Sequence, residues 1–204
     1  LPISPPDEVP VAPVPNKKYA LVVSFFSPGN GTDREAYERL LGLIAKSPKN
    51  FEAWKLKGDL MLHLKNQPEE ALAAFRKSVE VRPDYVAGHA AALRVLFQQN
   101  KLEEVDKQLA ALKAVAPNHP QTKFFEAQLA YQRKDFKLAR SLSQQVLKSA
   151  PNNALGLQLA GATELALNSP LQAESYLSKA VQLAPQMGMA RRLLAATYAR
   201  TGNT

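Results

Sequence analysis

The chain has 204 residues, of which 46% are hydrophobic and 22% charged, a composition that is typical of a folded protein and excludes disorder as the main state. Its formal net charge is +8, yet no basic run is longer than two residues, which favours a solvated basic surface over a dedicated nucleic-acid groove. The sequence contains no cysteine, so disulfides and thiolate metal sites are excluded.

The N-terminal part differs in composition from the rest of the chain. Residues 1–16 contain six prolines and are predicted to form an extended linker of the polyproline type. The segment 17–26, which is mainly apolar from Tyr19 onwards, is predicted to be either a strand or the short first helix of a degenerate unit spanning 17–50. It is much shorter than the roughly 18 residues that cross a bilayer. The first residue is Leu1 and not methionine, which suggests a processed or trimmed product.

Three series of residues recur along the chain with a common period of 34. Small or β-branched residues recur at Ala71, Val105, Ala139 and Ala173, and turn residues at Asn66, Asn100, Lys134, Asn168 and Gly202. Prolines recur with nearly the same spacing at Pro48, Pro83, Pro117, Pro151 and Pro185, and only the first interval is longer, by one position. Three series that share one period indicate an internal structural repeat.

Each period is predicted to form two helices. Apolar residues recur at helical spacing over 51–65 and over 69–81, and Pro83 ends the second helix because proline lacks an N–H donor and its ring clashes with the preceding turn. The same pattern predicts helices over 86–99, 102–115, 122–133, 136–149, 154–167, 171–183 and 189–200. The full units are then 51–85, 86–119, 120–153 and 154–187, followed by an unpaired first helix in 188–204.

Stacking of these pairs is obligatory, because one helix pair cannot bury its apolar faces alone. Small residues at Gly58, Ala127 and Gly161 mark the places where helices approach closely. The predicted fold is therefore all-α: a right-handed superhelical solenoid of stacked antiparallel helix pairs, with the first helices lining the concave side. The last helix would leave Leu193, Leu194 and Tyr198 half covered, so we expect another chain, including a second copy, or the N-terminal segment to cover this end face.

The repeat period, Trp54 with Gly58, Ala71 with Phe75, and the closing Pro83 resemble the tetratricopeptide repeat family over roughly residues 33–203. Lys57 and Lys134 depart from the family pattern, at sites that are usually apolar or glycine. The resemblance implies a non-catalytic scaffold for protein–protein interaction that binds a peptide or protein segment in its concave groove.

Four segments also resemble the long tetratricopeptide lipoprotein of the PEP-CTERM/exosortase systems: LKGDL (56–60), ALAAFRKS (71–78), LKSAP (147–151) and RRLLA (191–195). That family accompanies exopolysaccharide production in Gram-negative envelopes. The resemblance implies a periplasmic or outer-membrane-associated protein, tethered by a lipid on a cysteine that this sequence lacks. A cytoplasmic adaptor with the same groove is the alternative.

No pattern in the sequence indicates catalysis. His63, His89 and His119 lie at unmatched positions of the repeat and no two of them are four residues apart, which disfavours a zinc site, and there is no glycine-rich phosphate loop or nucleophile elbow. Acidic pairs such as Glu69 and Glu70 fall in the first turns of second helices, where the helix dipole explains them. We therefore expect no enzyme activity, no cofactor and no metal ion.

The remaining candidate for function is the groove lined by first helices. Phe97 and Tyr131 are one repeat period apart, so they would form a short aromatic ridge on adjacent helices, and aromatic anchors rimmed by Arg and Gln are typical of binding hot spots. Alternatively, Phe97, Phe124 and Tyr131 fill gaps between helices. The candidate partner-binding residues are Lys55, Asp59, Arg94, Phe97, Phe124, Gln128, Tyr131, Gln158 and Arg192.

A single-stranded RNA-binding solenoid is the rival from another class, and it needs stacked aromatics interleaved with basic residues. Only three aromatics gather in the predicted groove, with Glu52 and Asp59 nearby, so a protein partner is favoured.

Overall fold

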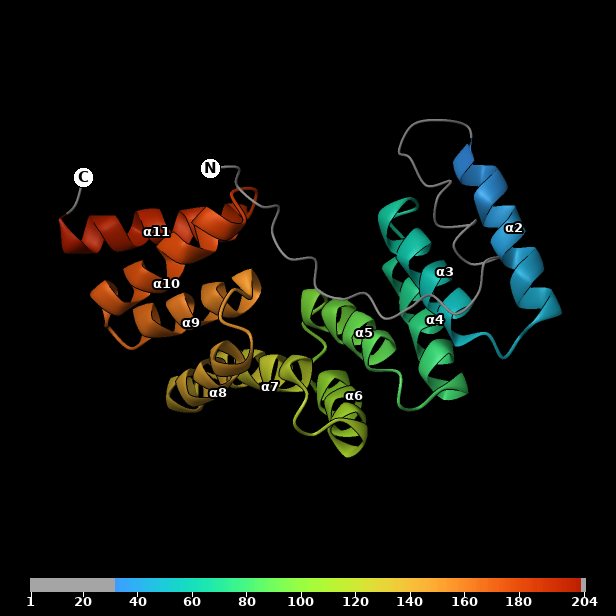
Figure 1. Ribbon diagram of the computed structural model, residues 1–204, viewed down its shortest axis with the longest axis horizontal. Helices are drawn as coiled ribbons and strands as arrows, with labels where there is room; N and C mark the ends of the chain where they lie inside the picture. The colour runs from blue at the N-terminus through green and yellow to red at the C-terminus, as the bar shows by residue number, and fades with distance from the viewer. Residues whose placement is uncertain (1–31, 203–204) are drawn as a thin grey trace, which may run out of the picture. The chain divides into compact units, whose positions relative to one another are not determined.

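The structure is a computed structural model that describes residues 32–202, and every regular element in that range is an α-helix (Figure 1). The chain divides into two compact units, the first ending at Arg82 and the second beginning at Pro83. The predicted linker 1–16 and the segment 17–26 lie outside the described residues. None of the helices between Thr32 and Thr201 combines the length and the apolar composition that a membrane crossing requires.

Successive helices pack against one another as antiparallel pairs in both units, which confirms the predicted all-α fold of stacked pairs. The first unit contains α2 (Thr32–Lys46), α3 (Phe51–His63) and α4 (Pro68–Val81). The second unit contains α5 (Val86–Gln98), α6 (Leu102–Val115), α7 (Pro120–Gln132), α8 (Phe136–Ser149), α9 (Ala154–Ala166), α10 (Pro170–Leu183) and α11 (Gly188–Thr201). The main contacts join helices that are adjacent in sequence or two places apart.

The five turn residues that recur with the period of 34 all adopt the left-handed conformation. Their φ angles are 50°, 55°, 62°, 58° and 76° at Asn66, Asn100, Lys134, Asn168 and Gly202. In three turns the next amide donates to the carbonyl five residues back: Lys101 to Leu96, Asp135 to Ala130 and Ser169 to Glu164. This bond closes the first helix with a Schellman motif. In the first unit the backbone N–H of Gln67 donates to the carbonyl oxygen of Met61, six residues back, and this longer turn accommodates one extra residue before Asn66.

Proline begins three of the helices, because its missing N–H is one of the donors that a helix N-terminus leaves unpaired anyway. The predicted starts of α4, α7 and α10 were therefore too late, and Pro68, Pro120 and Pro170 are the first helical residues. His119 is the N-cap of α7, and its Nδ1 accepts a hydrogen bond of 3.1 Å from the backbone N–H of Gln121.

Glycine allows the closest approach of paired helices. A Cβ placed on Gly58 would lie 2.3 Å from Cε1 of Phe75, and one on Gly161 would lie 2.5 Å from Cγ of Leu177. Both contacts join the first helix of a pair to its own second helix. A large second-helix side chain thus fills the space that the missing side chain leaves, as the sequence predicted for close helix crossings.

Gly161→Ala is expected to destabilise the second unit by ~1–3 kcal/mol, because even a methyl group overlaps Leu177, and Gly161→Leu is expected to cost more. Gly42→Ala is the matched control: a Cβ there meets nothing within 4 Å, so alanine should stabilise α2 by about 0.5–1 kcal/mol. Urea denaturation followed by circular dichroism measures both. Equal effects of the two alanines would contradict the close-packing explanation.

Candidate functional site

Three candidate residues of the second unit occupy one repeat position on three first helices. Phe124 on α7, Gln158 on α9 and Arg192 on α11 follow one another at the repeat period, and α7 contacts α9, which contacts α11. The side chains of Phe124 and Gln158 are half-buried, and that of Arg192 is exposed. We call the surface around them the first-helix face; it consists of Phe124, Gln128, Tyr131, Leu155, Gln158, Leu165, Met189, Arg192 and Arg200.

The aromatic side chains of this face are held in place by the core. Phe124 and Tyr131 both pack against the buried cluster that includes Ala127 and Leu142, and both remain half-buried. The Phe124 ring meets Phe125 edge-on at 5.4 Å between centroids, and the Tyr131 ring meets Phe136 edge-on at the same distance. Each ring is fixed on one side and accessible on the other, which suits a contact residue whose ordering costs little on binding.

Two exposed aliphatic side chains extend the face across α9 and α11. Leu155 and Met189 are each 50% exposed and occupy equivalent repeat positions, the second residue of their helices. Met189 is not among the candidate residues predicted from the sequence, although the repeat period itself points to it. Arg200 connects the two helices, since its Nη1 donates to the backbone oxygen of Leu165 at 3.3 Å.

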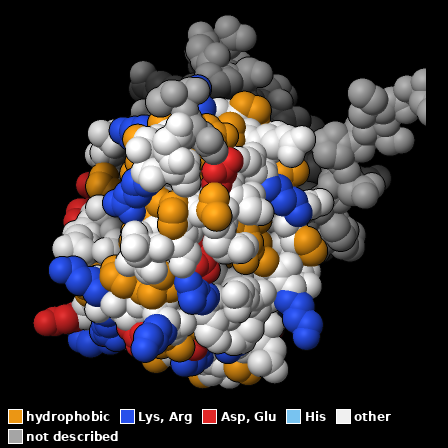
Figure 2. Space-filling view, turned by 90° about the vertical axis from the view of Figure 1, so that its left-hand side faces the viewer, with side chains coloured by type: hydrophobic (Ala, Val, Ile, Leu, Met, Phe, Trp, Pro, Cys, Tyr) orange, Lys and Arg blue, Asp and Glu red, His pale blue; other side chains and the backbone are white. Residues whose placement is uncertain are grey.

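The first-helix face has a net positive charge, because the acidic residues near it are paired with basic residues of second helices. The acidic residues of α7 and α9 are Glu126 and Glu164, and they pair with Lys113 and Arg140 on second helices. Helix α11 contains three arginines and no acidic residue, and no described residue forms an ion pair with Arg192. Figure 2 shows the side of the molecule where α11 ends, on which basic and hydrophobic side chains are interspersed with acidic ones.

The other candidate residues do not contribute to this face in the same way. Lys55 and Asp59 belong to the first unit and pair with each other, Nζ to Oδ2, at 2.6 Å. Arg94 on α5 is exposed. Phe97 is only 6% exposed, and its ring stacks on Phe125 at 6.0 Å with 11° between the planes. Of the two alternatives drawn from the sequence, Phe97 therefore fits the second, in which its ring fills a gap between helices as a core residue.

The described histidines have local partners or solvent around them. His89 is buried, with Nε2 2.8 Å from the Pro83 carbonyl oxygen and Nδ1 2.6 Å from Nε2 of Gln108. His63 is exposed at the end of α3. Between residues 32 and 202, no three His, Asp or Glu side chains lie close enough together to hold a metal ion.

Comparison with known proteins places the fold. Residues 34–86 match the family model described as a tetratricopeptide repeat, and no curated protein matches the sequence. The chain is similar to PilW, described as a widely conserved type IV pilus biogenesis factor, with 17% identity over 92% of this chain and 86% of that one and a TM-score of 0.74. It is also similar to YrrB, described as a TPR protein with an unusual peptide-binding site, with 17% identity over 82% of this chain and 86% of that one and a TM-score of 0.57. The similarity to yeast Tom70 has 18% identity over 91% of this chain and 39% of that one, with a TM-score of 0.60.

At these identities the likeness shows the fold alone. Together with the family match it supports the predicted tetratricopeptide architecture, and it lends no support to the finer resemblance to the exosortase-associated lipoprotein family.

Proposed function

We propose that this chain, built from helix pairs of the tetratricopeptide type, is a non-catalytic scaffold that holds a segment of another protein on the first-helix face. The observation that supports this most is the composition of that face. Fixed aromatic rings, exposed aliphatic side chains and the exposed Arg192 lie on one surface, and none of the residues that define it is acidic. Large rings and arginine are the residue types that dominate binding energy at protein interfaces.

The three helices offer different chemistry to such a segment. Apolar side chains of the partner would pack on Phe124 and Tyr131 of α7 and then on Leu155 of α9. The amides of Gln128 and Gln158 are half-buried beside them and can hydrogen-bond a peptide backbone. An acidic group of the partner would meet Arg192 on α11. The bound segment would therefore be largely apolar, with an acidic residue towards the α11 end.

The experiment is affinity capture from a native envelope extract, with the bound protein identified by mass spectrometry and its segment mapped on overlapping peptides. Tyr131→Ala and Arg192→Glu should each weaken that peptide by about 30-fold, which corresponds to the ~2 kcal/mol of a hot-spot residue. Gln145→Ala is the matched control, because Gln145 is an exposed glutamine on the second helix α8, outside the first-helix face. Unchanged affinity in both face variants would exclude this surface as the binding site.

We also propose, from the sequence resemblance alone, that the scaffold works in the bacterial envelope alongside exopolysaccharide export or protein sorting. A generic cytoplasmic adaptor with the same face is the alternative. A lipobox cysteine encoded upstream in the gene, or recovery of the native protein in the membrane fraction, would support the envelope. Recovery in the cytosolic fraction would support the adaptor.

Self-association through α11 belongs to the same proposal. Leu193, Leu194 and Tyr198 are half-buried on this helix, and Met189 beside them is half-exposed. Sedimentation velocity over a range of concentrations tests it, with Leu194→Glu expected to shift any dimer to monomer. If the wild-type chain stays monomeric over the whole range of concentrations, self-association through α11 is excluded.

A further inference from the structure

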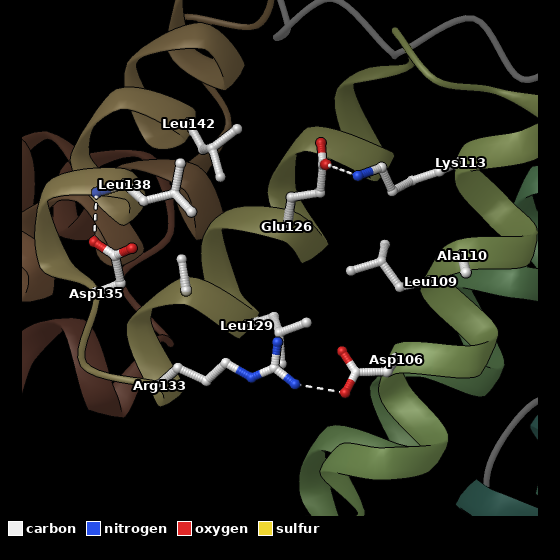
Figure 3. Close-up of a pocket in the computed structure, with 11 residues that line it drawn as sticks. Asp106, Leu109, Ala110, Lys113, Glu126, Leu129, Arg133, Asp135, Leu138 and Leu142 are labelled. Carbon is white, nitrogen blue, oxygen red and sulfur yellow. Dashed lines mark hydrogen bonds and ion pairs between the residues drawn. The ribbon is translucent and has the colours of Figure 1, made fainter.

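A cleft of about 610 Å³ opens on the second unit (Figure 3). Helices α6, α7 and α8 form its walls, and it shares no residue with the first-helix face. Leucines and alanines line its middle, while charged side chains stand at its two ends. The lining residues are Asp106, Leu109, Ala110, Lys113, Glu126, Leu129, Ala130, Arg133, Asp135, Leu138 and Leu142.

Two of the three walls carry the same stripe of side chains. On α6 an acid, a leucine, an alanine and a base stand at positions i, i+3, i+4 and i+7, from Asp106 to Lys113. On α7 the same order runs from Glu126 to Arg133. Because the acid of each helix pairs with the base of the other, two ion pairs close the ends of the cleft: Lys113 with Glu126, and Arg133 with Asp106.

The two ends differ in their residual charge. At one end Glu126 is shared by Lys113, at 2.6 Å, and Lys123, at 3.0 Å, which leaves an excess positive charge. Burial raises the pKa of Glu126, but hydrogen bonds from the two lysines outweigh it and hold that pKa below its usual value. Arg133 at the other end pairs with Asp106, and Asp135, the N-cap of α8, adds a second carboxylate to the lining, which leaves an excess negative charge.

The next repeat shows that an open apolar cleft is not a general property of this fold. Six lining positions recur one repeat period later around a smaller cavity of about 380 Å³, formed by α8, α9 and α10. There Gln144 replaces Ala110 and Glu164 replaces Ala130. Arg140 reaches across that cavity to Glu164 and Ser169. The first cleft is open because the two alanines leave its middle empty.

We propose that this cleft seats one amphipathic helix of a partner protein. Seven positions separate Glu126 from Arg133 along α7, so the seat is about 10 Å long, or two helical turns. The partner helix would place apolar side chains at i+3 and i+4 over the alanines and Leu138, which is 48% exposed. An acidic residue at one end would face Lys113 and Lys123, and a basic residue at i+7 would face Asp106 and Asp135. Apolar anchors at this spacing are how a helix binds in a groove.

The test uses three fluorescently labelled, stapled helical peptides that share leucines at i+3 and i+4. One carries Glu at i and Lys at i+7, one carries Glu at both ends, and one carries Lys at both. Fluorescence anisotropy with the full chain should show the mixed-charge peptide binding at least about tenfold more tightly than either like-charge peptide. Ala110→Trp, which fills the cleft, should weaken that binding at least about tenfold, whereas Ala111→Trp on the same helix should not.

This inference would be overturned by no binding of the mixed-charge peptide, by equal binding of all three peptides, or by binding that Ala110→Trp leaves unchanged. Self-association of the full chain that Ala110→Trp abolishes and Ala111→Trp retains would show that the occupant is a second copy, which also overturns it. Circular dichroism of both tryptophan variants establishes that each is folded. Because the first-helix face is intact in all of them, failure here is separate from failure of the proposed function.

Discussion

Phe97→Ala is expected to destabilise the second unit by ~3–5 kcal/mol, the range for removing a buried phenylalanine ring. The ring is 6% exposed and stacks on Phe125, so its loss leaves a cavity between α5 and α7. Tyr131→Ala, at the equivalent position of the next repeat, should cost clearly less, because Tyr131 is only half-buried. The two variants therefore separate a core ring from a contact ring at one repeat position.

Urea denaturation followed by circular dichroism gives the free energy of unfolding for both variants. Binding of the captured partner segment gives the second measurement: Tyr131→Ala should lose affinity while its helices persist, and Phe97→Ala should lose stability first. If Phe97→Ala proves as stable as the wild type yet no longer binds, the ring is a binding anchor and its assignment to the core is wrong.

The second large effect is expected at the ion pair that joins α8 to α9. Nε of Arg140 donates to Oε1 of Glu164 at 2.9 Å, and Nη2 donates to the other carboxylate oxygen. Glu164 hydrogen-bonds the guanidinium and thereby raises the pKa of Arg140. The Glu164 side chain is 5% exposed, so Arg140→Leu should cost about 3 kcal/mol by leaving a buried carboxylate without its partner.

The double variant Arg140→Leu with Glu164→Ala tests directly whether the unpaired buried carboxylate causes the loss of stability. It removes both charges, and it places at position 164 the alanine that the preceding repeat carries at Ala130. Most of the lost stability should return, because the cost lies in the unpaired charge and not in the missing contact. If the double variant is as unstable as the sum of the two single variants, packing by the Arg140 side chain is what stabilises this junction.

The fold was largely predictable because each repeat fixes its own helix ends. Proline after each second helix and a turn residue after each first helix are read directly from the sequence, and the left-handed φ of Asn100 and Lys134 explains why that series recurs. Helix starts were less predictable. The apolar pattern places the start of this helix at residue 122, whereas the helix begins at Pro120, because a proline at the first helical position leaves every hydrogen bond of the helix intact.

The candidate site was predictable in position but not in exposure. Phe97 and Tyr131 are equivalent in the repeat, yet one is buried and the other is not. Helix α5 is buried at nearly every position from Gly88 to Phe97, whereas α7 keeps an accessible side. Periodicity assigns a residue to a face of its helix, and the depth of burial depends on neighbours that periodicity does not specify. The cleft of α6, α7 and α8 escaped sequence reasoning for the same reason, since two alanines create it.

The reliance of each helix on its sequence neighbours also determines how the chain gains and loses its structure. The main contacts in both units join helices at most two places apart. Folding therefore loses little chain entropy, because no segments distant in sequence have to be brought together. Such arrays fold quickly and open from their ends, one pair after another. Amide hydrogen exchange should accordingly be fastest in α11 and progressively slower towards α9 and α7, so that protection of the first-helix face is graded along its length.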